Sequence, residues 1–330
     1  MLNHSFSNWI MYSKDLIHIG PLAFKPLVFY LTIILLLILL TILLLVYKTN
    51  QKKDHKSLQQ RTPEKTKEVI SKTKEVIQNG DSRYKVGKLH NIGKRSNQQD
   101  SFAVSDESDP ILCNNKGLIA IVADGMGGLS DGDKVSSIVT LSFFRYFHEK
   151  DTTSPSEALL SMLREANEEV NNYLGDKITQ AGSTLVSGII KDNKLYWISV
   201  GDSHIYHYRN GSLIRLNREH TYSHELDTKA ANGEISREAA LNDPQRDALT
   251  SYIGMGRLEQ IDRNHTPLEL YSGDRVIFMS DGVFGTIGDM AIETIMKYPI
   301  DESIQKLDEA IKTANKRNQD NYTAVIIQCE

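Results

Sequence analysis

The stretch Gly117-Leu-Ile-Ala-Ile-Val-Ala-Asp-Gly-Met-Gly-Gly128 decides the fold, because an apolar strand runs directly into an aspartate, Asp124, and a glycine-rich turn. Other apolar runs of the chain also begin or end close to an aspartate. These aspartates are Asp100, Asp202, Asp281 and Asp320. Carboxylates at the ends of core-forming strands are costly to desolvate unless they are paired or bound to a cation. Few lysines or arginines adjoin these aspartates in the sequence. Such a site, rich in oxygen and without thiolates, suits Mg²⁺ or Mn²⁺.

The remaining strands and helices are predicted from composition and periodicity. Short runs rich in Val, Ile and Tyr and bounded by Gly, Asp or Asn predict strands at 117–123, 184–190, 195–200, 204–209, 275–279 and 322–328. Helices are predicted at 134–149, 155–174 and 303–317. Consecutive strands joined by short polar turns indicate antiparallel sheets, and grouped helices indicate an α+β arrangement of layers. Residues 81–330 are expected to form one domain.

Composition separates the chain, which has 330 residues, into two parts of opposite charge. The net charge is −4, from 38 Lys and Arg against 42 Asp and Glu. Residues 1–80 carry 11 basic and 5 acidic side chains, a net +6, so residues 81–330 carry the other 27 and 37, a net −10. An acidic domain disfavours nucleic acid as a partner, since nucleic acid binds a basic face. Two cysteines, Cys113 and Cys329, are too few for a disulfide-built scaffold or a four-cysteine zinc site.

The run Leu27–Val46 contains 20 residues without a charge. At about 1.5 Å per residue, such a helix is about 30 Å long, which matches the hydrocarbon thickness of a bilayer. We therefore predict a transmembrane helix over 27–47, with residues 1–26 as a short non-cytoplasmic segment. Seven basic residues follow this helix within 48–67, and only two precede it, so the positive-inside rule places the C-terminal part in the cytoplasm. The expected location is the cell membrane, which the chain crosses once.

Residues 48–80 are predicted to form a polar juxtamembrane linker that contains a short heptad repeat. The sequence Thr-Lys-Glu-Val-Ile occurs at 66–70 and again at 73–77, a period of seven residues that places the aliphatic pairs on one stripe of a helix. This stripe fits a solvated spacer helix. The alternative is a short coiled coil that would pair two copies of the chain through residues 62–79, although two heptads are few for that assignment.

Six motifs, taken in order, resemble those of a known family. They are Arg95-Ser-Asn-Gln-Gln-Asp-Ser-Phe102, Val122-Ala-Asp-Gly-Met-Gly-Gly128, Ala181-Gly-Ser-Thr-Leu-Val186, Val200-Gly-Asp-Ser203, Met279-Ser-Asp-Gly282 and Asp320-Asn-Tyr-Thr-Ala-Val325. Together they are similar to the metal-dependent (PPM-type, class 2C) protein serine/threonine phosphatases in their bacterial form. Each motif alone is weak, whereas six in the right order over residues 84–328 are specific. The resemblance implies a phosphatase domain over 81–330, built as two antiparallel β-sheets packed in a sandwich with helices on both outer faces.

The resemblance also implies a site for two ions of Mn²⁺ or Mg²⁺. Asp124 would bridge the two ions, and Gly125 would bind one of them through its carbonyl oxygen. Asp281 and Asp320 would complete the coordination of the other ion, while Asp100 would hold metal-bound waters or bind directly. Two ions close together lower the pKa of a bridging water, and the resulting hydroxide would attack phosphorus in line, without a phosphoenzyme.

Other residues of the motifs receive binding or supporting roles from the resemblance. Arg95 would bind the substrate phosphate, because a guanidinium matches two phosphate oxygens at once. Asp202 and Asn321 are expected to support the site rather than to bind metal. Gln99 stands where many relatives have an acid, so one outer charge is missing. A third, weak metal site of the family usually has an acid shortly before the Gly-Ser-Thr motif; here Asp176 precedes that motif by six residues, which leaves the third site open.

The segment 219–256 resembles the family's flap, a structure beside the active site that would contact the phosphoprotein. It contains His220 and His224, which are four residues apart, as zinc ligands on a helix would be. The residues between them lack the Glu of a His-Glu-x-x-His motif, so we interpret both as flap histidines. The glycines at 125–128 likewise match neither of the common glycine-rich nucleotide motifs, which disfavours ATP or NAD as a cofactor.

The predicted function is therefore that of a membrane-anchored protein phosphatase. Its substrates would be phosphoserine and phosphothreonine in cytoplasmic proteins, the products of serine/threonine kinases. Thiol catalysis is disfavoured, since neither cysteine lies in a basic loop that could bind phosphate. Two alternatives stay open: a non-catalytic, membrane-tethered scaffold of the same fold that binds phosphoproteins, and a metal-dependent hydrolase of small phosphoesters.

Overall fold

The structure is a computed structural model that describes residues 10–12, 17–19, 22–24, 41, 83–127, 131–178 and 180–330. The chain divides into two compact units, Met1–Gly80 and Asp81–Glu330. In the first unit, three short strands form an antiparallel sheet: β1 (Ile10–Tyr12), β2 (Ile17–Ile19) and β3 (Leu22–Phe24). The predicted transmembrane segment 27–47, apart from Thr41, and the predicted linker 48–80 with its repeat at 62–79 lie outside the described residues. Within the described part of the chain, no helix has the length and apolar character needed to span a membrane.

A seven-stranded antiparallel sheet forms one half of the second unit. Its main strands follow the spatial order β12-β9-β8-β6-β5, with β13 paired to β9 and β7 paired to β6. The strands are β5 (Asp100–Val104), β6 (Leu118–Met126), β7 (Gly182–Ser183), β8 (Leu185–Lys191), β9 (Lys194–Val200), β12 (Asp262–Arg263) and β13 (Leu268–Glu269). β6 lies between β5 and β8, so the apolar stretch Leu118–Met126 becomes an interior strand.

The apolar residues of β6 divide between two cores according to the two-residue period of a strand. Ile119 and Ile121 face the helices that cover the sheet. Leu118, Ala120 and Val122 face the second sheet of the sandwich. Both faces are therefore covered, which explains why this strand reads as a continuous apolar run rather than as an alternation of apolar and polar residues.

A five-stranded antiparallel sheet packs against the first, in the order β11-β10-β14-β15-β4. Its strands are β4 (Tyr84–Asn91), β10 (His204–Arg209), β11 (Ser212–Arg215), β14 (Arg275–Met279) and β15 (Tyr322–Cys329). In β14, Val276 and Phe278 join the core between the sheets, while Ile277 and Met279 join the core under the outer helices. The same alternation that orients β6 thus orients β14.

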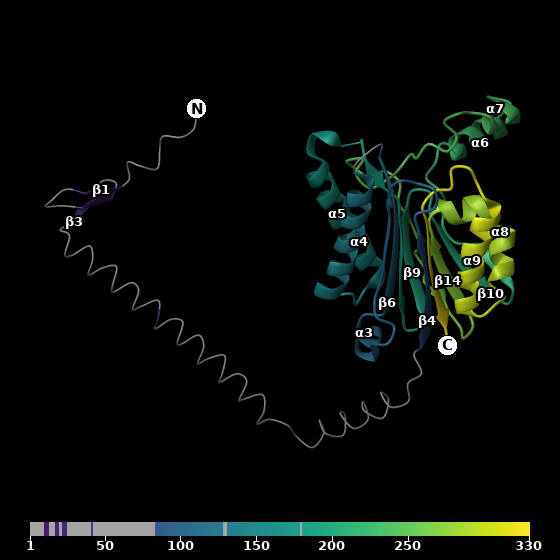
Figure 1. The fold of residues 1–330 in the computed structure, drawn as a ribbon, viewed down its shortest axis with the longest axis horizontal. Coiled ribbons are helices and arrows are strands. Elements are labelled where there is room, and N and C mark those ends of the chain that lie inside the picture. The colour runs from purple at the N-terminus through teal and green to yellow at the C-terminus, as the bar shows by residue number, and fades with distance from the viewer. Residues whose placement is uncertain are drawn as a thin grey trace, which may run out of the picture. The chain divides into compact units, whose positions relative to one another are not determined.

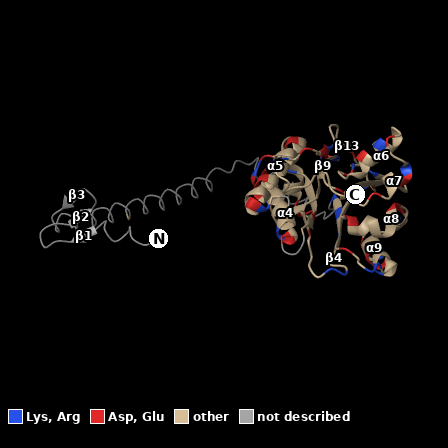
Figure 2. Cartoon of the chain, turned by 90° about the horizontal axis from the view of Figure 1, so that it is seen from above, with Lys and Arg blue, Asp and Glu red and all other residues tan. Residues whose placement is uncertain are grey.

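Two pairs of helices cover the outer faces of the sandwich, as Figure 1 shows. The helices of the second unit are α3 (Pro110–Asn115), α4 (Gly132–Glu149), α5 (Pro155–Leu174), α6 (Ser223–Ala231), α7 (Arg237–Leu241), α8 (Asp281–Ile295) and α9 (Ile300–Ala314), with the 3₁₀ turn η1 (Gly175–Lys177). α4 and α5 pack on the seven-stranded sheet, and α8 and α9 pack on the five-stranded sheet. Their charged residues lie on the outside, with several acidic positions along α5 (Figure 2). The predicted α+β sandwich of two antiparallel sheets with helices is confirmed.

Helix α8 was not among the predicted helices, and its sequence explains why. It contains Gly282, Gly285 and Gly288, and glycine is a poor helix former because its unfolded backbone has the most freedom to lose. Gly288 breaks the helix with φ 75° and ψ 162°. Tertiary packing overrides this weak local preference, since Val283 and Ile292 of α8 are completely buried on the sheet.

Candidate active site

Strand register places five aspartates at one end of the sandwich. Asp100 begins β5 and lies directly opposite Asp124 near the end of β6. β14 and β15 are antiparallel neighbours, so Asp281, which follows β14, meets Asp320, which precedes β15. β10 pairs His204 with Met279 of β14, which brings Asp202 to the same end.

Two hydroxyl groups join Asp100 to the opposite sheet. Its Oδ2 accepts hydrogen bonds from the Ser280 hydroxyl at 2.8 Å and from the Thr323 hydroxyl at 2.7 Å. The Thr323 amide donates in turn to Ser280 Oγ at 3.0 Å. Ser280 and Thr323 received no role from the sequence, although they stand inside the quoted motifs next to the acidic residues. Their place in the motifs was the available signal, but only the contact with Asp100 shows what they do.

Two carboxylate oxygens of the cluster are buried and bond to no described residue: Oδ1 of Asp100 and Oδ1 of Asp281. Asp100 is 5% exposed. A buried carboxylate oxygen without a donor costs free energy, because it has given up water without receiving a replacement. Both residues belong to the predicted ligand set, so these oxygens point to a cation as the missing partner.

Burial and mutual repulsion raise the pKa values of this cluster. The pKa of Asp100 is raised to about 6, first by burial, against the two hydroxyl bonds that favour the charged form. Burial and the charge of Asp281 raise the pKa of Asp202 to about 7. Burial, followed by the charges of Asp100 and Asp281, holds the pKa of Asp124 well above its ordinary value. The pKa of Asp281 is raised by burial and then by the charge of Asp320. Divalent cations would relieve this repulsion.

Arg95 and Asp320 form an ion pair at the rim of the cluster. Arg95 Nη2 lies 2.6 Å from Asp320 Oδ2, and the side chains are 52% and 40% exposed. The predicted phosphate-binding residue therefore contacts a predicted metal ligand. Because both side chains are well exposed, either can rotate to another partner at low cost.

The Asn321 side chain holds the loop that carries Arg95 and leads into Asp100. Its side-chain Nδ2 donates to the carbonyl of Ile92 at 2.8 Å and to that of Asn97 at 3.1 Å. Its side-chain oxygen accepts from the Gln99 amide at 2.8 Å. The carbonyl of Gln99 then accepts from the Gly125 amide at 3.0 Å. The Asn321 side chain and the main chain of Gln99 thus connect the loop to the glycine turn.

Gly125 occupies a position that only glycine fits. A Cβ atom there would lie 2.1 Å from the carbonyl oxygen of Gly132 and 2.6 Å from that of Gln99. Both obstacles are backbone atoms, which cannot rotate away. The close approach of α4 to the end of β6 therefore depends on the missing side chain.

Asp176 lies apart from this cluster. It is exposed on the turn η1, and within the described ranges no hydrogen bond or ion pair joins it to the five aspartates. Its neighbour Lys177 instead approaches Asp131 at 3.5 Å.

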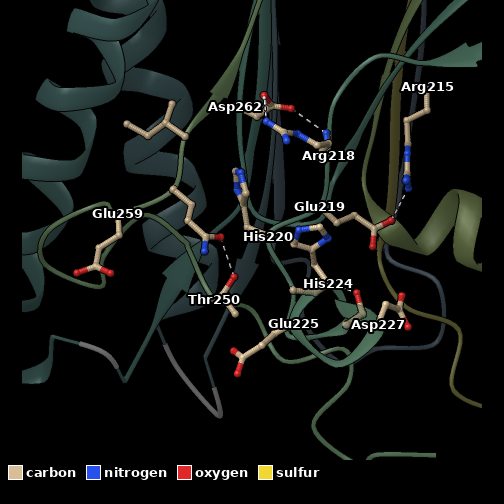
Figure 3. Close-up of a pocket in the computed structure, with 14 residues that line it drawn as sticks. Arg215, Arg218, Glu219, His220, His224, Glu225, Asp227, Thr250, Glu259 and Asp262 are labelled. Carbon is tan, nitrogen blue, oxygen red and sulfur yellow. Dashed lines mark hydrogen bonds and ion pairs between the residues drawn. The ribbon is translucent and has the colours of Figure 1, made fainter. Parts of the chain in front are cut away.

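The predicted flap carries α6 and α7 and encloses a polar pocket of about 530 Å³ against the core, which Figure 3 shows. His220 connects this pocket to the Asp202 strand end, because its Nδ1 accepts from the Gly201 amide at 3.0 Å. His220 precedes α6 whereas His224 lies within it, so the two do not share a helix. Most of the pocket's charges are paired; for example, Arg215 lies 2.6 Å from Glu219.

The residues present fit divalent cations, although their side chains are not preformed as a cage. In the described ranges, no three His, Cys, Asp and Glu side chains are arranged to hold one metal ion as they stand. The ion pair explains part of this, since Arg95 occupies Asp320. The oxygen-only donor set, the partnerless oxygens and the raised pKa values all suit Mg²⁺ or Mn²⁺, which bind carboxylates and carbonyls.

Comparisons with known proteins identify the family. The family model described as protein phosphatase 2C matches residues 86–321. The serine/threonine phosphatase stp of Listeria welshimeri is 30% identical over 217 residues, which cover 64% of this chain and 84% of that protein. The chain therefore belongs to the protein phosphatase 2C family and is a metal-dependent serine/threonine phosphatase.

Solved structures share the fold. The serine/threonine phosphatase of S. agalactiae has a TM-score of 0.64 and 26% identity, over 75% of this chain and 100% of that one. The catalytic domain of the phosphatase PstP, in complex with two manganese ions, has a TM-score of 0.59 and 23% identity, over 74% of this chain and 97% of that one. At this identity the second likeness concerns the fold alone.

Proposed function

We propose that this phosphatase is anchored in the cell membrane by a single helix and hydrolyses phosphoserine and phosphothreonine in cytoplasmic proteins with two divalent ions. The observation that carries the catalytic part is the aspartate cluster, in which Asp100 and Asp281 each keep a buried oxygen without a described partner. Repulsion and burial alone would make such a cluster unfavourable, and bound cations would stabilise it.

The ligands in this proposal are those expected from the family resemblance. Asp124 and the carbonyl of Gly125 would hold the ions from β6, and Asp281 and Asp320 would hold them from the opposite sheet. Asp100, fixed by its two hydroxyl donors, would contact an ion or its waters. When bound, the ions supply Lewis-acid chemistry: they activate a water as the nucleophile and neutralise charge on the phosphoryl oxygens.

Arg95 would bind and orient the substrate phosphate. Its guanidinium now pairs with Asp320, and a phosphate group likewise offers anionic oxygens to which a guanidinium can donate two hydrogen bonds. Engagement of Asp320 by a cation would remove that partner and leave the arginine available. Since Arg95 is half exposed, this change of partner needs only a side-chain rotation.

The membrane part of the proposal rests on sequence. Leu27–Val46 contains 20 uncharged residues, which is long enough to span a bilayer as a helix. The basic residues that follow it favour a cytoplasmic catalytic unit. Membrane fractionation and protease protection of tagged full-length chain would test this. A catalytic unit found in the soluble fraction, or cut from outside intact cells, would refute it.

The repeat at 62–79 is proposed as a spacer helix. The alternative is that it pairs two chains, which cross-linking would detect.

Catalysis is tested by assaying the purified full-length chain in detergent with Mn²⁺. We expect hydrolysis of both a phosphothreonine peptide and p-nitrophenyl phosphate, and loss of both in EDTA. Turnover of p-nitrophenyl phosphate without any turnover of phosphopeptides would instead indicate a hydrolase of small phosphoesters. A folded chain that hydrolyses neither would contradict the proposal.

A further inference from the structure

A groove runs along the outer edge of the seven-stranded sheet and reaches the aspartate cluster. Its volume is about 650 Å³, and residues of β4, β5, α4 and α5 line it. Asp100 and Phe102 of β5 form part of its wall, together with Ile138 and Leu141 of α4 and Tyr173 of α5. Because Asp100 also belongs to the catalytic cluster, the groove is continuous with the active site.

Strand β5 has an open backbone edge. It is the last strand of its sheet and pairs only with β6 among the described strands. The Gly125 amide donates to the carbonyl of Gln99, which shows that the odd-numbered residues bond to β6. In an antiparallel ladder the residues between them direct their N–H and C=O groups the other way. Phe102 and Val104 therefore present theirs at the outer edge, where no described residue pairs with them.

The wall of the groove that α4 provides is polar at the start of the helix, with Asp133, Lys134 and Ser137, and includes the apolar residues Ile138 and Leu141. The helix buries Val139 and Phe143 against the sheet, whereas Leu141 on its other side is 67% exposed. Tyr173 beside it is 43% exposed. Exposed apolar side chains that gather at a groove continuous with an active site suit the side chain of a bound ligand.

Contacts between α4 and β5 show the direction of the groove. The Ser136 hydroxyl donates to the Gln99 carbonyl at 2.5 Å, next to Asp100. One turn further along α4, the Thr140 hydroxyl lies 2.8 Å from the Ser101 hydroxyl. The first turns of α4 thus lie near the carboxylates, and Leu141 lies further along the strand. The groove is charged at its catalytic end and apolar beyond it.

We propose that this groove binds the phosphoprotein substrate as an extended segment that pairs with the outer edge of β5. This inference rests on the proposed function. The phosphorylated residue lies at the Asp100 end, and an apolar side chain two residues away packs on Ile138 and Leu141. The spacing follows from strand geometry: side chains on one face of an extended chain recur every second residue, about 7 Å apart. Edge pairing is a general mode of peptide recognition in which the backbone supplies affinity and alternate pockets supply specificity.

The first test uses Leu141→Asp in the full-length chain. The substrates are phosphothreonine peptides with Leu or Asp at the second residue before or after the phosphothreonine, and p-nitrophenyl phosphate. For wild type, we expect one of the two Leu peptides to exceed its Asp counterpart about tenfold in kcat/KM, the effect of partly burying one leucine side chain. The substitution should abolish that preference through KM and leave p-nitrophenyl phosphate hydrolysis unchanged.

Ile111→Asp is the matched control. Ile111 is 60% exposed on α3, at the end of the sandwich away from α6 and α7 (Figure 1). This control should change neither substrate. Leu141→Asp would overturn the proposal if it left the peptide preference intact, or if it slowed p-nitrophenyl phosphate equally. Wild type that fails on p-nitrophenyl phosphate itself would instead contradict the proposed catalytic function.

The second test addresses strand pairing. Peptides carrying one N-methyl group lose one backbone donor, so methylation at alternate residues beside the phosphothreonine should reduce kcat/KM about fivefold to tenfold, and methylation at the residues between them should not. Equal effects at both sets of positions, or none at either, would overturn the pairing with β5.

Discussion

The two ends of strand β14 carry aspartates in opposite situations. Asp274 precedes the strand, is 2% exposed, and accepts from Arg209 Nε and from the Tyr271 amide, each at 2.8 Å. Burial opposes its charge, but the Arg209 hydrogen bonds and the Tyr271 amide outweigh burial, and its pKa lies below the ordinary value. Asp281 follows the strand, keeps a buried oxygen without a described partner, and has a raised pKa.

This difference separates a structural carboxylate from a proposed metal ligand at opposite ends of one strand. The protein supplies Asp274 with the guanidinium of Arg209, so its charge is paired within the chain. At the other end it gathers Asp281 with further aspartates and supplies hydroxyls and the exposed Arg95 instead. The free energy that this end lacks is what divalent cations would provide.

The largest effect is expected from Asp281→Asn, which keeps the size of the side chain and removes its charge. Activity should fall by about 10³-fold or more, because a ligand for the ions is lost. In EDTA the variant should melt at or above the wild-type temperature, since a repelled charge has gone. The matched variant Asp274→Asn should retain activity per folded molecule. Wild-type rates in Asp281→Asn would refute the assignment of the site.

The second effect concerns pH in EDTA. The folded pKa of Asp100 is raised from 3.8 to about 6, so between these values the folded state binds more protons than the unfolded state. Stability from this group therefore falls as pH rises from about 4 to about 6, by on the order of 3 kcal/mol. Asp274 acts in the opposite direction, because its lowered pKa gives stability that is lost as pH falls.

Urea unfolding at several pH values, compared between wild type and Asp100→Asn, isolates the contribution of Asp100 to the pH dependence of stability. The variant should lose stability less steeply with rising pH than wild type does. Parallel pH profiles for the two proteins would show that Asp100 is not held protonated by its surroundings.

The third effect is stabilisation by metal. Mn²⁺ at about 100 times its Kd should stabilise the folded chain by about 2.7 kcal/mol, because it binds the folded state alone. Thermal melts with Mn²⁺ and with EDTA measure this without any assay of activity. Asp281→Asn should lose most of the shift, and Asp274→Asn should keep it. The same shift in both variants would place the ions elsewhere.

The smallest effect is expected from Asp274→Asn. The substitution weakens the charged hydrogen bonds to Arg209 and should cost about 1 to 2 kcal/mol of stability, measured by urea unfolding. Its response to Mn²⁺ and its kcat should stay at wild-type values. A loss of kcat in this variant would mean that the two ends of β14 are coupled, and the comparison between them would fail.

Local pattern was sufficient to predict much of the fold. The predicted strands at 204–209 and 275–279 coincide with β10 and β14, and the predicted helix 155–174 coincides with α5. These segments have the clear periodicity or capping that local sequence expresses. α8 was missed because its glycines obscure the helical pattern, and packing on the sheet decides its conformation.

The sequence by itself determined the strands, the aspartates at their ends and the order of the motifs, since each depends on residues close together in the chain. Only the tertiary structure decided that Asp100 lies opposite Asp124 and is held by hydroxyls 180 and 223 positions away. It also decided that Arg95 pairs with Asp320 and that β5 keeps an open edge beside α4. The physical reason is that strand register and the packing of two sheets, rather than local preference, determine which distant side chains share one site.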